Sequence, residues 1–382
     1  MTAVSRLCLL SSSLLLAIGF VRADDPVYDG KTADAWSEIL KLDPSARKRA
    51  LAATALGELR NKHGVKDAHK DLGRSLRVDK STAVRAQCAI AIAGLRALDL
   101  KEIDFEIIEA IKEEKDSRVR KELSILFGRF PEFAKRAVPG LSAILKDSDA
   151  EARTAAADAL AKLGSDAKDA ATDLLTLIDD PNKSARQAGI FALGRIAPEN
   201  ASFVAAALLK RFDEEKERDI RREIIVSLKL IGDKSESTVA ALAKALADPE
   251  DDVKAAVAAC LGTFGAAARP AVEPLLKLAR ESKDKGLRID ALRAFGSALG
   301  PALKERLKDV IGIMESDVDF EVRLVAVEEL GSLGMELKDD KETMAALRKR
   351  LSDPQVKVRE AAAVAIRRIE KKPDPKPPEK KP

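Results

Sequence analysis

The sequence predicts an all-α fold, a right-handed α-solenoid of about ten two-helix repeats. Three observations support this prediction. A basic residue returns ten times at intervals of 33 to 36 residues, and an acidic residue stands six positions before nine of the ten. Small and apolar residues follow each basic residue at helical spacing. Self-similarity at a period of 20–50 residues is typical of solenoids and repeat arrays.

The repeated acid and base are predicted to form a structural ladder, because a catalytic group is usually needed only once. The basic positions are Arg49, Arg85, Arg120, Arg153, Arg186, Arg221, Lys254, Arg288, Arg323 and Arg359. The acids are Asp43, Asp79, Glu114, Asp147, Asp180, Glu215, Asp248, Asp317 and Asp353, with Ser282 in the eighth repeat. Turn carbonyls and helix-start N–H groups between stacked units need such partners. Arg186→Ala is therefore predicted to cost roughly 1–3 kcal/mol of stability.

The second helix of each repeat is predicted to begin directly after the acid, about five residues before the basic residue. Proline directly follows the acid at Pro44, Pro181, Pro249 and Pro354, which is typical of an N-cap and the first helical residue. Downstream, apolar residues fall at +3, +6 or +7, and +10 from the basic residue, which is one stripe of an α-helix. Glycines are predicted to end this helix at Gly57, Gly164, Gly232 and Gly300.

The first helix of each repeat is predicted from a shorter amphipathic run before the acid. Such runs are Val138–Leu145, Thr172–Ile178, Val239–Leu246, Val272–Leu278 and Met344–Leu351. Aromatic residues are only 3% of the chain, and no segment alternates polar and apolar residues for long. No strand is therefore predicted.

These repeats resemble those of the HEAT-repeat family. The resemblance is closest at Asp147–Arg153, Asp180–Arg186, Asp248–Lys254, Asp317–Arg323 and Asp353–Arg359, and it covers about residues 32–369. The short, Ala-rich units are most similar to the bacterial PBS lyase HEAT-like repeats. The third and eighth repeats depart from the pattern. The resemblance implies two antiparallel helices per unit, acid–Arg hydrogen bonds within and between turns, and second helices that line a concave, protein-binding face.

The chain is predicted to contain one continuous array with no internal domain boundary. Residues 1–23 have the layout of a signal peptide, with an uncleaved anchor as the alternative, and residues 24–31 form a lead-in. The array spans 32–370, and 371–382 is a Pro- and Lys-rich tail predicted to be disordered. We therefore expect an exported protein, periplasmic or extracellular, that is monomeric and has no transmembrane span after cleavage.

The net charge and the cysteine content do not point to a particular functional class of protein. The formal net charge is +4, but the predicted signal segment and tail carry much of it, and the body keeps 60 basic and 61 acidic residues. Such a body has no bulk attraction for nucleic acid or anionic lipid, so no specific nucleic acid is expected. Cys88 and Cys260 fall on core positions and are expected to be buried and unpaired.

No pattern in the sequence predicts catalysis, a cofactor or a metal. His63 and His69 stand six residues apart in a polar loop, a spacing that matches no zinc arrangement. Asp251 and Asp252 read as a helix start and not as a calcium loop. Nucleotide, nucleophile-elbow and haem-attachment motifs are absent from the sequence.

The candidate partner-binding residues are those that break the repeat. Arg129, Lys162 and Arg195 stand nine residues after the basic residue in three consecutive repeats, and Trp36 is the single tryptophan. The first hypothesis is a non-catalytic scaffold that binds a protein partner. A bilin-lyase-like or other enzyme-associated subunit is the second hypothesis. The third is a binder of acidic polymers through the basic residues and the tail.

Overall fold

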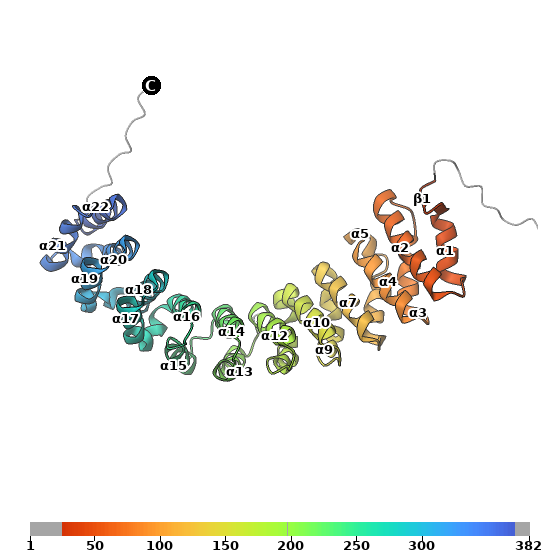
Figure 1. Cartoon of the computed structure of the whole chain (residues 1–382), viewed down its shortest axis with the longest axis horizontal. Helices are drawn as coiled ribbons and strands as arrows, with labels where there is room; N and C mark the ends of the chain where they lie inside the picture. Colours follow the sequence, from red (N-terminus) through yellow and green to blue (C-terminus); the bar gives the residue numbers. More distant parts are fainter. Residues whose placement is uncertain (1–24, 197, 371–382) are drawn as a thin grey trace, which may run out of the picture. The chain divides into compact units, whose positions relative to one another are not determined.

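The computed structural model describes residues 25–196 and 198–370, so the predicted signal peptide and the tail lie outside the described residues. The chain divides into two compact units, Met1–Ala137 and Val138–Pro382. The sequence analysis predicts one continuous array, and this division is a difference from it. Both units are built from helices, joined by short turns (Figure 1).

Unit 1 contains three helix pairs preceded by a small hairpin. The hairpin is β1 (Val27–Tyr28) and β2 (Lys31–Thr32). The pairs are α1 (Ala33–Leu42) with α2 (Ala46–His63), α3 (Ala68–Val78) with α4 (Thr82–Ala93), and α6 (Asp104–Glu113) with α7 (Ser117–Arg129). Short helices connect or follow them: α5 (Ala97–Leu100), α8 (Pro131–Ala134) and the 3-10 turn η1 (Lys135–Ala137).

The hairpin corrects the prediction that the chain has no strand. Val27 pairs with Thr32 and Tyr28 with Lys31, and Asp29 and Gly30 turn the chain with φ of 47° and 72°. An Asp-Gly pair favours this two-residue turn because both positions need a positive φ. Two-residue strands are too short to show any alternation, so the period test misses them.

Trp36 is a core residue of the first repeat and not a contact for partners. Its side chain is 2% exposed, and its Nε1–H donates a hydrogen bond to the Tyr28 carbonyl at 2.9 Å. The Tyr28 ring meets it edge-on, with centroids 6.3 Å apart. The hairpin and Trp36 together cover the end of the first repeat, as a terminal unit of an array requires. The proposed partner-binding role of Trp36 is therefore wrong.

Unit 2 contains seven helix pairs among its described residues. The first helices are α9 (Val138–Ile144), α11 with η3 (Ala171–Leu174, Leu175–Leu177), α13 (Ala201–Glu214), α15 (Glu236–Ala245), α17 (Val272–Glu281), α19 (Leu307–Ser316) and α21 (Lys341–Arg350). The second helices are α10 (Ala150–Leu163), α12 (Lys183–Arg195), α14 (Arg218–Ile231), α16 (Asp251–Phe264), α18 (Lys285–Leu299), α20 (Phe320–Ser332) and α22 (Val356–Glu370). Between pairs run η2 (Gly164–Ala170), η4 (Gly265–Ala271), η5 (Gly300–Arg306) and η6 (Gly334–Leu337).

The helices of unit 2 form two layers. Each second helix packs against the second helix of the next repeat, from α10 through to α22, and Figure 1 shows them along one side of the unit with the first helices along the other. The predicted core stripe is confirmed: Ala192 and Leu193 of α12 and Ile196, directly after it, are fully buried. Each repeat thus buries its apolar stripe against its neighbours.

Every second helix begins three residues before the ladder residue, and not five as predicted. Asp43, for example, is the C-cap residue of α1, and Ser45 is the N-cap of α2. The Asp43 carboxylate accepts the N–H of Ser45 at 2.8 Å, and the same contact recurs at Asp79 and Asp180. The acid therefore closes the turn between the two helices, and the prolines lie within this turn.

Gly164, Gly232 and Gly300 follow their helices with φ of 56°, 71° and 51°, which confirms three of the four predicted helix ends. Gly57 is the exception, because it lies inside α2, which continues to Gly64 (φ 67°). A Cβ on Gly57 would stand 3.0 Å from the Ala91 Cβ on α4. Gly57 permits two second helices to approach closely and does not end one.

The stretch Asp251–Glu281 is long and apolar enough to cross a membrane by composition alone, with a mean hydropathy of 1.4. In the structure it is not one helix. It consists of α16, η4 and α17, which belong to two successive repeats, and the chain turns at Gly265 with φ 58°. Neither α16 nor α17 approaches the roughly 20 residues that a membrane-spanning helix needs.

Candidate interaction surface

The ladder residues link each repeat to the next. The guanidinium of one repeat donates to the acid of the following repeat, with Nε–O distances between 2.7 and 3.2 Å. The pairs are Arg49–Asp79, Arg85–Glu114, Arg153–Asp180, Arg186–Glu215, Arg221–Asp248, Arg288–Asp317 and Arg323–Asp353. Each pair lies within one unit. An acid and the arginine six residues after it therefore do not pair with each other. The arginine pairs with the acid of the following repeat.

Each guanidinium also holds its own turn. The Nη1 atom of Arg153 donates to the carbonyls of Asp147 and Ser148, at 2.7 and 3.2 Å. Arg359 makes the same two contacts, to Asp353 and Pro354, at 2.8 and 3.1 Å. One arginine thus satisfies turn carbonyls that no helix can pair and a carboxylate of the next repeat.

The ladder acids Asp180 and Asp353 are held in the ionised form. Burial alone would raise the pKa of Asp180, but hydrogen bonds from Arg153 and the Asn182 N–H bring that pKa below its ordinary value. For Asp353 the hydrogen bond from Arg323 is the largest influence, and it also lowers the pKa. These pairs are ionised at neutral pH and contribute to stability there.

One pair of the ladder is missing in unit 2. Ser282 replaces the acid, and Lys254 replaces the arginine that would reach it. The Ser282 hydroxyl still accepts the Asp284 N–H at 3.2 Å, so the turn is kept. Lys254 instead pairs with Asp251 on its own helix at 2.5 Å. The two departures from the pattern thus belong to the same pair.

Restoring this pair is expected to stabilise unit 2. The double variant Lys254→Arg/Ser282→Asp can form the bidentate contact that the other repeats have, whereas either single variant lacks one partner. We expect a favourable coupling energy of about 1–2 kcal/mol between the two changes in a double-mutant cycle measured by urea unfolding. Strictly additive effects would show that the two positions do not face each other as the ladder geometry requires.

The second helices expose apolar side chains. In unit 1, Ile90 of α4 and Ile125 of α7 are exposed five residues after the ladder position. In unit 2, Phe191 of α12 occupies the same position and is 40% exposed, and Leu230 of α14 is 48% exposed. We call Phe191, Leu230 and the half-buried Val226 the apolar patch. Large apolar side chains in solvent mark binding surfaces when they gather on one face.

The predicted basic residues lie at the C-terminal ends of second helices. Arg129 ends α7 in unit 1, and its guanidinium lies 5.8 Å from the centre of the Phe130 ring. Lys162 of α10 and Arg195 of α12 are exposed on adjacent helices of unit 2. Lys229 of α14, which is not among the predicted residues, is exposed one helix further along. It stands eight rather than nine residues after the ladder arginine, so a fixed-offset comparison misses it.

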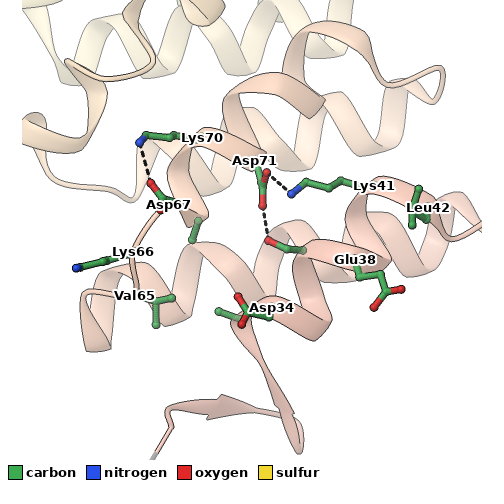
Figure 2. Close-up of a pocket in the computed structure, with 12 residues that line it drawn as sticks. Asp34, Glu38, Lys41, Leu42, Val65, Lys66, Asp67, Lys70 and Asp71 are labelled. Carbon is green, nitrogen blue, oxygen red and sulfur yellow. Dashed lines mark hydrogen bonds and ion pairs between the residues drawn. The ribbon is translucent and has the colours of Figure 1, made fainter. Parts of the chain in front are cut away.

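A groove of about 660 Å³ lies in unit 1 between α1 and α3 (Figure 2). Its charged side chains largely pair with one another. Lys41 contacts Asp71 at 2.6 Å, Lys70 contacts Asp67 at 2.7 Å, and the Ser37 hydroxyl donates to Asp71. These exposed ion pairs are typical of a solvated surface and do not converge on one point.

The residues with reactive side chains give no sign of chemistry. Cys88 and Cys260 are both buried and free, and burial raises the pKa of Cys260 to about 12, so its thiol stays protonated. His69 is buried on α3, with Nε2 3.2 Å from the Glu102 carboxylate. Among the described residues, no three His, Cys, Asp or Glu side chains gather closely enough to hold a metal ion.

One charged residue sits in the contact between two second helices. In unit 2 the position six residues after the ladder residue faces the preceding helix and is small in every other repeat, as in Ala294 and Ala365. In α20 it is Glu329, whose carboxylate covers Gly296 of α18 so closely that a Cβ there would overlap it. Arg293 pairs with Glu328 at 3.2 Å, and Glu329 forms no ion pair with a described residue. Burial raises the pKa of Glu329 to about 7.

Solved structures with a similar fold include importin beta and the karyopherin Kap121p. Importin beta aligns with a TM-score of 0.54 at 16% identity, over 89% of this chain and 51% of that one. The karyopherin Kap121p bound to the extreme C-terminus of the protein phosphatase Cdc14p aligns with a TM-score of 0.55 at 15% identity, over 89% and 42%. Kap121p bound to Pho4p gives 0.54 at 16%, over 88% and 41%. This chain therefore spans about half of those proteins or less, and the likeness concerns the fold.

No curated protein matches the chain in sequence. The family model described as HEAT repeats matches residues 105–194, 171–262, 205–296 and 307–378, which together cover more than half of the chain. The helix pairs, the acid in the turn between them and the arginine of the second helix agree with that match. The chain therefore belongs to the HEAT-repeat family.

Proposed function

We propose that the protein is a non-catalytic scaffold that binds a protein partner on the face formed by its second helices. The apolar patch is the observation that carries the proposal. Phe191 and Leu230 lie on adjacent helices of unit 2, and both are more than a third exposed although they are large and apolar. A partner that covers them would gain roughly 25 cal/mol for each Å² of apolar surface removed from water.

Two further observations support a binding role over an enzymatic one. The reactive thiols of the described residues are buried, and the repeated arginines, such as Arg153 and Arg221, are engaged in ladder pairs. The fold neighbours include Kap121p in complexes with Cdc14p and with Pho4p. A covalent bilin-lyase-like role would need a reactive thiol, and burial raises the pKa of both described cysteines.

A photo-crosslinking residue tests this proposal. Placed at Phe191 of the full chain, in cells that produce the protein, it is expected to capture one or a few defined protein partners. The matched control is Phe203, which is 61% exposed on the first helix α13 of the same unit. Equal capture from both positions, or capture from Phe203 alone, would show that the second-helix face is not the binding face.

We also propose that the protein acts outside the cytoplasm. The support is the charged start, the apolar run and the small residues before Asp24 in the sequence, a layout typical of signal peptides. The N-terminal sequence of the protein recovered from the extracytoplasmic fraction would begin at Asp24. A full-length protein confined to the cytoplasm would contradict this.

A further inference from the structure

A row of three basic side chains crosses unit 2 at the C-terminal ends of its second helices. Lys162, Arg195 and Lys229 belong to α10, α12 and α14, which pack one against the next, and all three are exposed. None of them forms an ion pair with another described residue. Lys162 and Arg195 hold the same position in successive repeats, and packed helices lie about 8–10 Å apart, so these two residues are separated by about that distance. Lys229 stands one residue earlier on its own helix. We call them the basic row.

The basic row differs from nearby charges that join successive repeats. Lys168 contacts Glu199 at 2.5 Å, Lys183 contacts Glu217 at 2.8 Å, and Arg218 contacts Asp252 at 2.7 Å. Each of these cations meets an acid of the next repeat. No ion pair joins the basic row to an acid of the next repeat among the described residues. A helix C-terminus favours one cation, but a series of like charges repels and leaves a positive potential.

Two partly buried acids, Asp158 and Glu223, lie on the same second helices as Lys162 and Lys229. Asp158 lies one turn before Lys162, and Glu223 lies nearer the start of α14. Burial raises the pKa of both carboxyl groups, so each is held less firmly in the charged form than an exposed acid. Asp158 attracts the charge of Lys162, whereas Glu223 attracts that of Arg222, which is not part of the basic row.

The apolar patch adjoins the basic row. Phe191 precedes Arg195 by four residues, so the two share one face of α12. Leu230 directly follows Lys229 on α14. A ligand that reaches the three cations would therefore meet apolar side chains as well. A purely charged polymer would leave these side chains in water, whereas a peptide with both kinds of residue would cover them.

We propose that the basic row binds an acidic, extended segment of the partner protein, with an apolar side chain of that segment against Phe191 and Leu230. The segment runs across the ends of α10, α12 and α14. An extended chain advances about 3.3 Å per residue, so acids that match cations about 8–10 Å apart recur every third residue. This inference rests on the proposed function, to which it adds the chemistry of the partner.

Selection from a random 12-residue peptide library on the full chain tests the inference. Peptides are enriched on the wild-type protein and then sorted by loss of binding to the triple variant Lys162→Gln/Arg195→Gln/Lys229→Gln. The control variant, Lys210→Gln/Lys244→Gln/Lys277→Gln, removes the same charge from exposed lysines on the first helices α13, α15 and α17. We expect enriched peptides with acids at i, i+3 and i+6 and an apolar residue among them. Their affinity should fall at least tenfold in the first variant and less than twofold in the control.

The other outcomes separate the two proposals. Enriched peptides that lose binding to the Phe191→Asp variant but carry no excess of acidic residues would contradict an acidic segment. They would still support the scaffold function. Peptides that bind equally well to Phe191→Asp/Leu230→Asp would overturn the binding face itself. Acidic peptides without apolar residues, displaced equally by heparin, would make the row a site for polyanions and contradict the proposed segment.

Discussion

Arg153→Ala is expected to reduce the unfolding free energy of unit 2 by about 3 kcal/mol, since it leaves a buried carboxylate without its partner. Arg153 donates two hydrogen bonds to Asp180, at 2.7 and 2.8 Å, and another to the Asp147 carbonyl at 2.7 Å. Asp180 is 7% exposed and would keep only the Asn182 N–H. Urea unfolding followed by circular dichroism measures the loss, and hydrogen exchange should show faster opening of the turn before α12.

Arg359→Ala is the matched control for this prediction. Arg359 holds the same position in the last repeat, where it contacts two carbonyls but no acid of a following repeat. Its loss should be about 1 kcal/mol, the usual value of such hydrogen bonds. Equal losses in the two variants would show that the link between repeats adds nothing. Arg186→Ala should fall between them, because Arg211 also contacts its partner Glu215, at 2.7 Å.

Glu329→Gln is expected to remove a pH dependence from the stability of unit 2. The pKa of Glu329 is raised in the folded protein from 4.5 to about 7, so the folded state binds this proton more tightly than the unfolded chain. Its stabilising effect is full below about pH 4.5, falls as the pH rises to 7, and is absent above that. Between pH 8 and pH 5 the wild type should gain roughly 2–3 kcal/mol relative to the variant.

The groups around Glu329 allow this effect to be isolated. Arg293 on α18 and Glu328 on α20 are the charged side chains that influence it, and they pair with each other. The pKa values of the ladder acids Asp180 and Asp353 are lowered, so these two lose their contribution only below about pH 4, outside the window. Glu328→Gln serves as the control. Parallel pH profiles for wild type and Glu329→Gln would contradict the buried position of this carboxylate.

The period of the sequence predicts the helix pairs and the ladder, because both depend on residues that recur. The structure of the turn between the two helices of a repeat is harder to predict from the sequence. An Asp before Pro can cap a helix, or it can accept the N–H two residues ahead while ending the previous helix, and Asp43 does the latter. The sequence pattern is the same in both cases. The partners of each arginine also follow from stacking, which places Asp180 beside Arg153 rather than Asp147.

The interaction surface was predicted only in part. Lys162 and Arg195 lie on adjacent helices as predicted, whereas Trp36 is buried by the hairpin, which a test for alternation could not find. Glu329 carries a signal in the sequence, since Ala294 and Ala365 hold the same position in the flanking repeats. The burial of the Glu329 carboxylate depends on its contact with Gly296 of the neighbouring helix. This contact between residues of two repeats is visible only in the folded structure.

The offset of the ladder has a consequence for the length of the array. Where an arginine pairs with the acid of the following repeat, as in Arg153–Asp180 and Arg221–Asp248, a cut between the two repeats leaves one member of the pair on each side. Removing or duplicating the segment between two such cuts rejoins an arginine to an acid in the usual register. The array can therefore change its length by whole units of 33 to 36 residues without an unmatched charge, whereas any shorter insertion within a turn would break a pair.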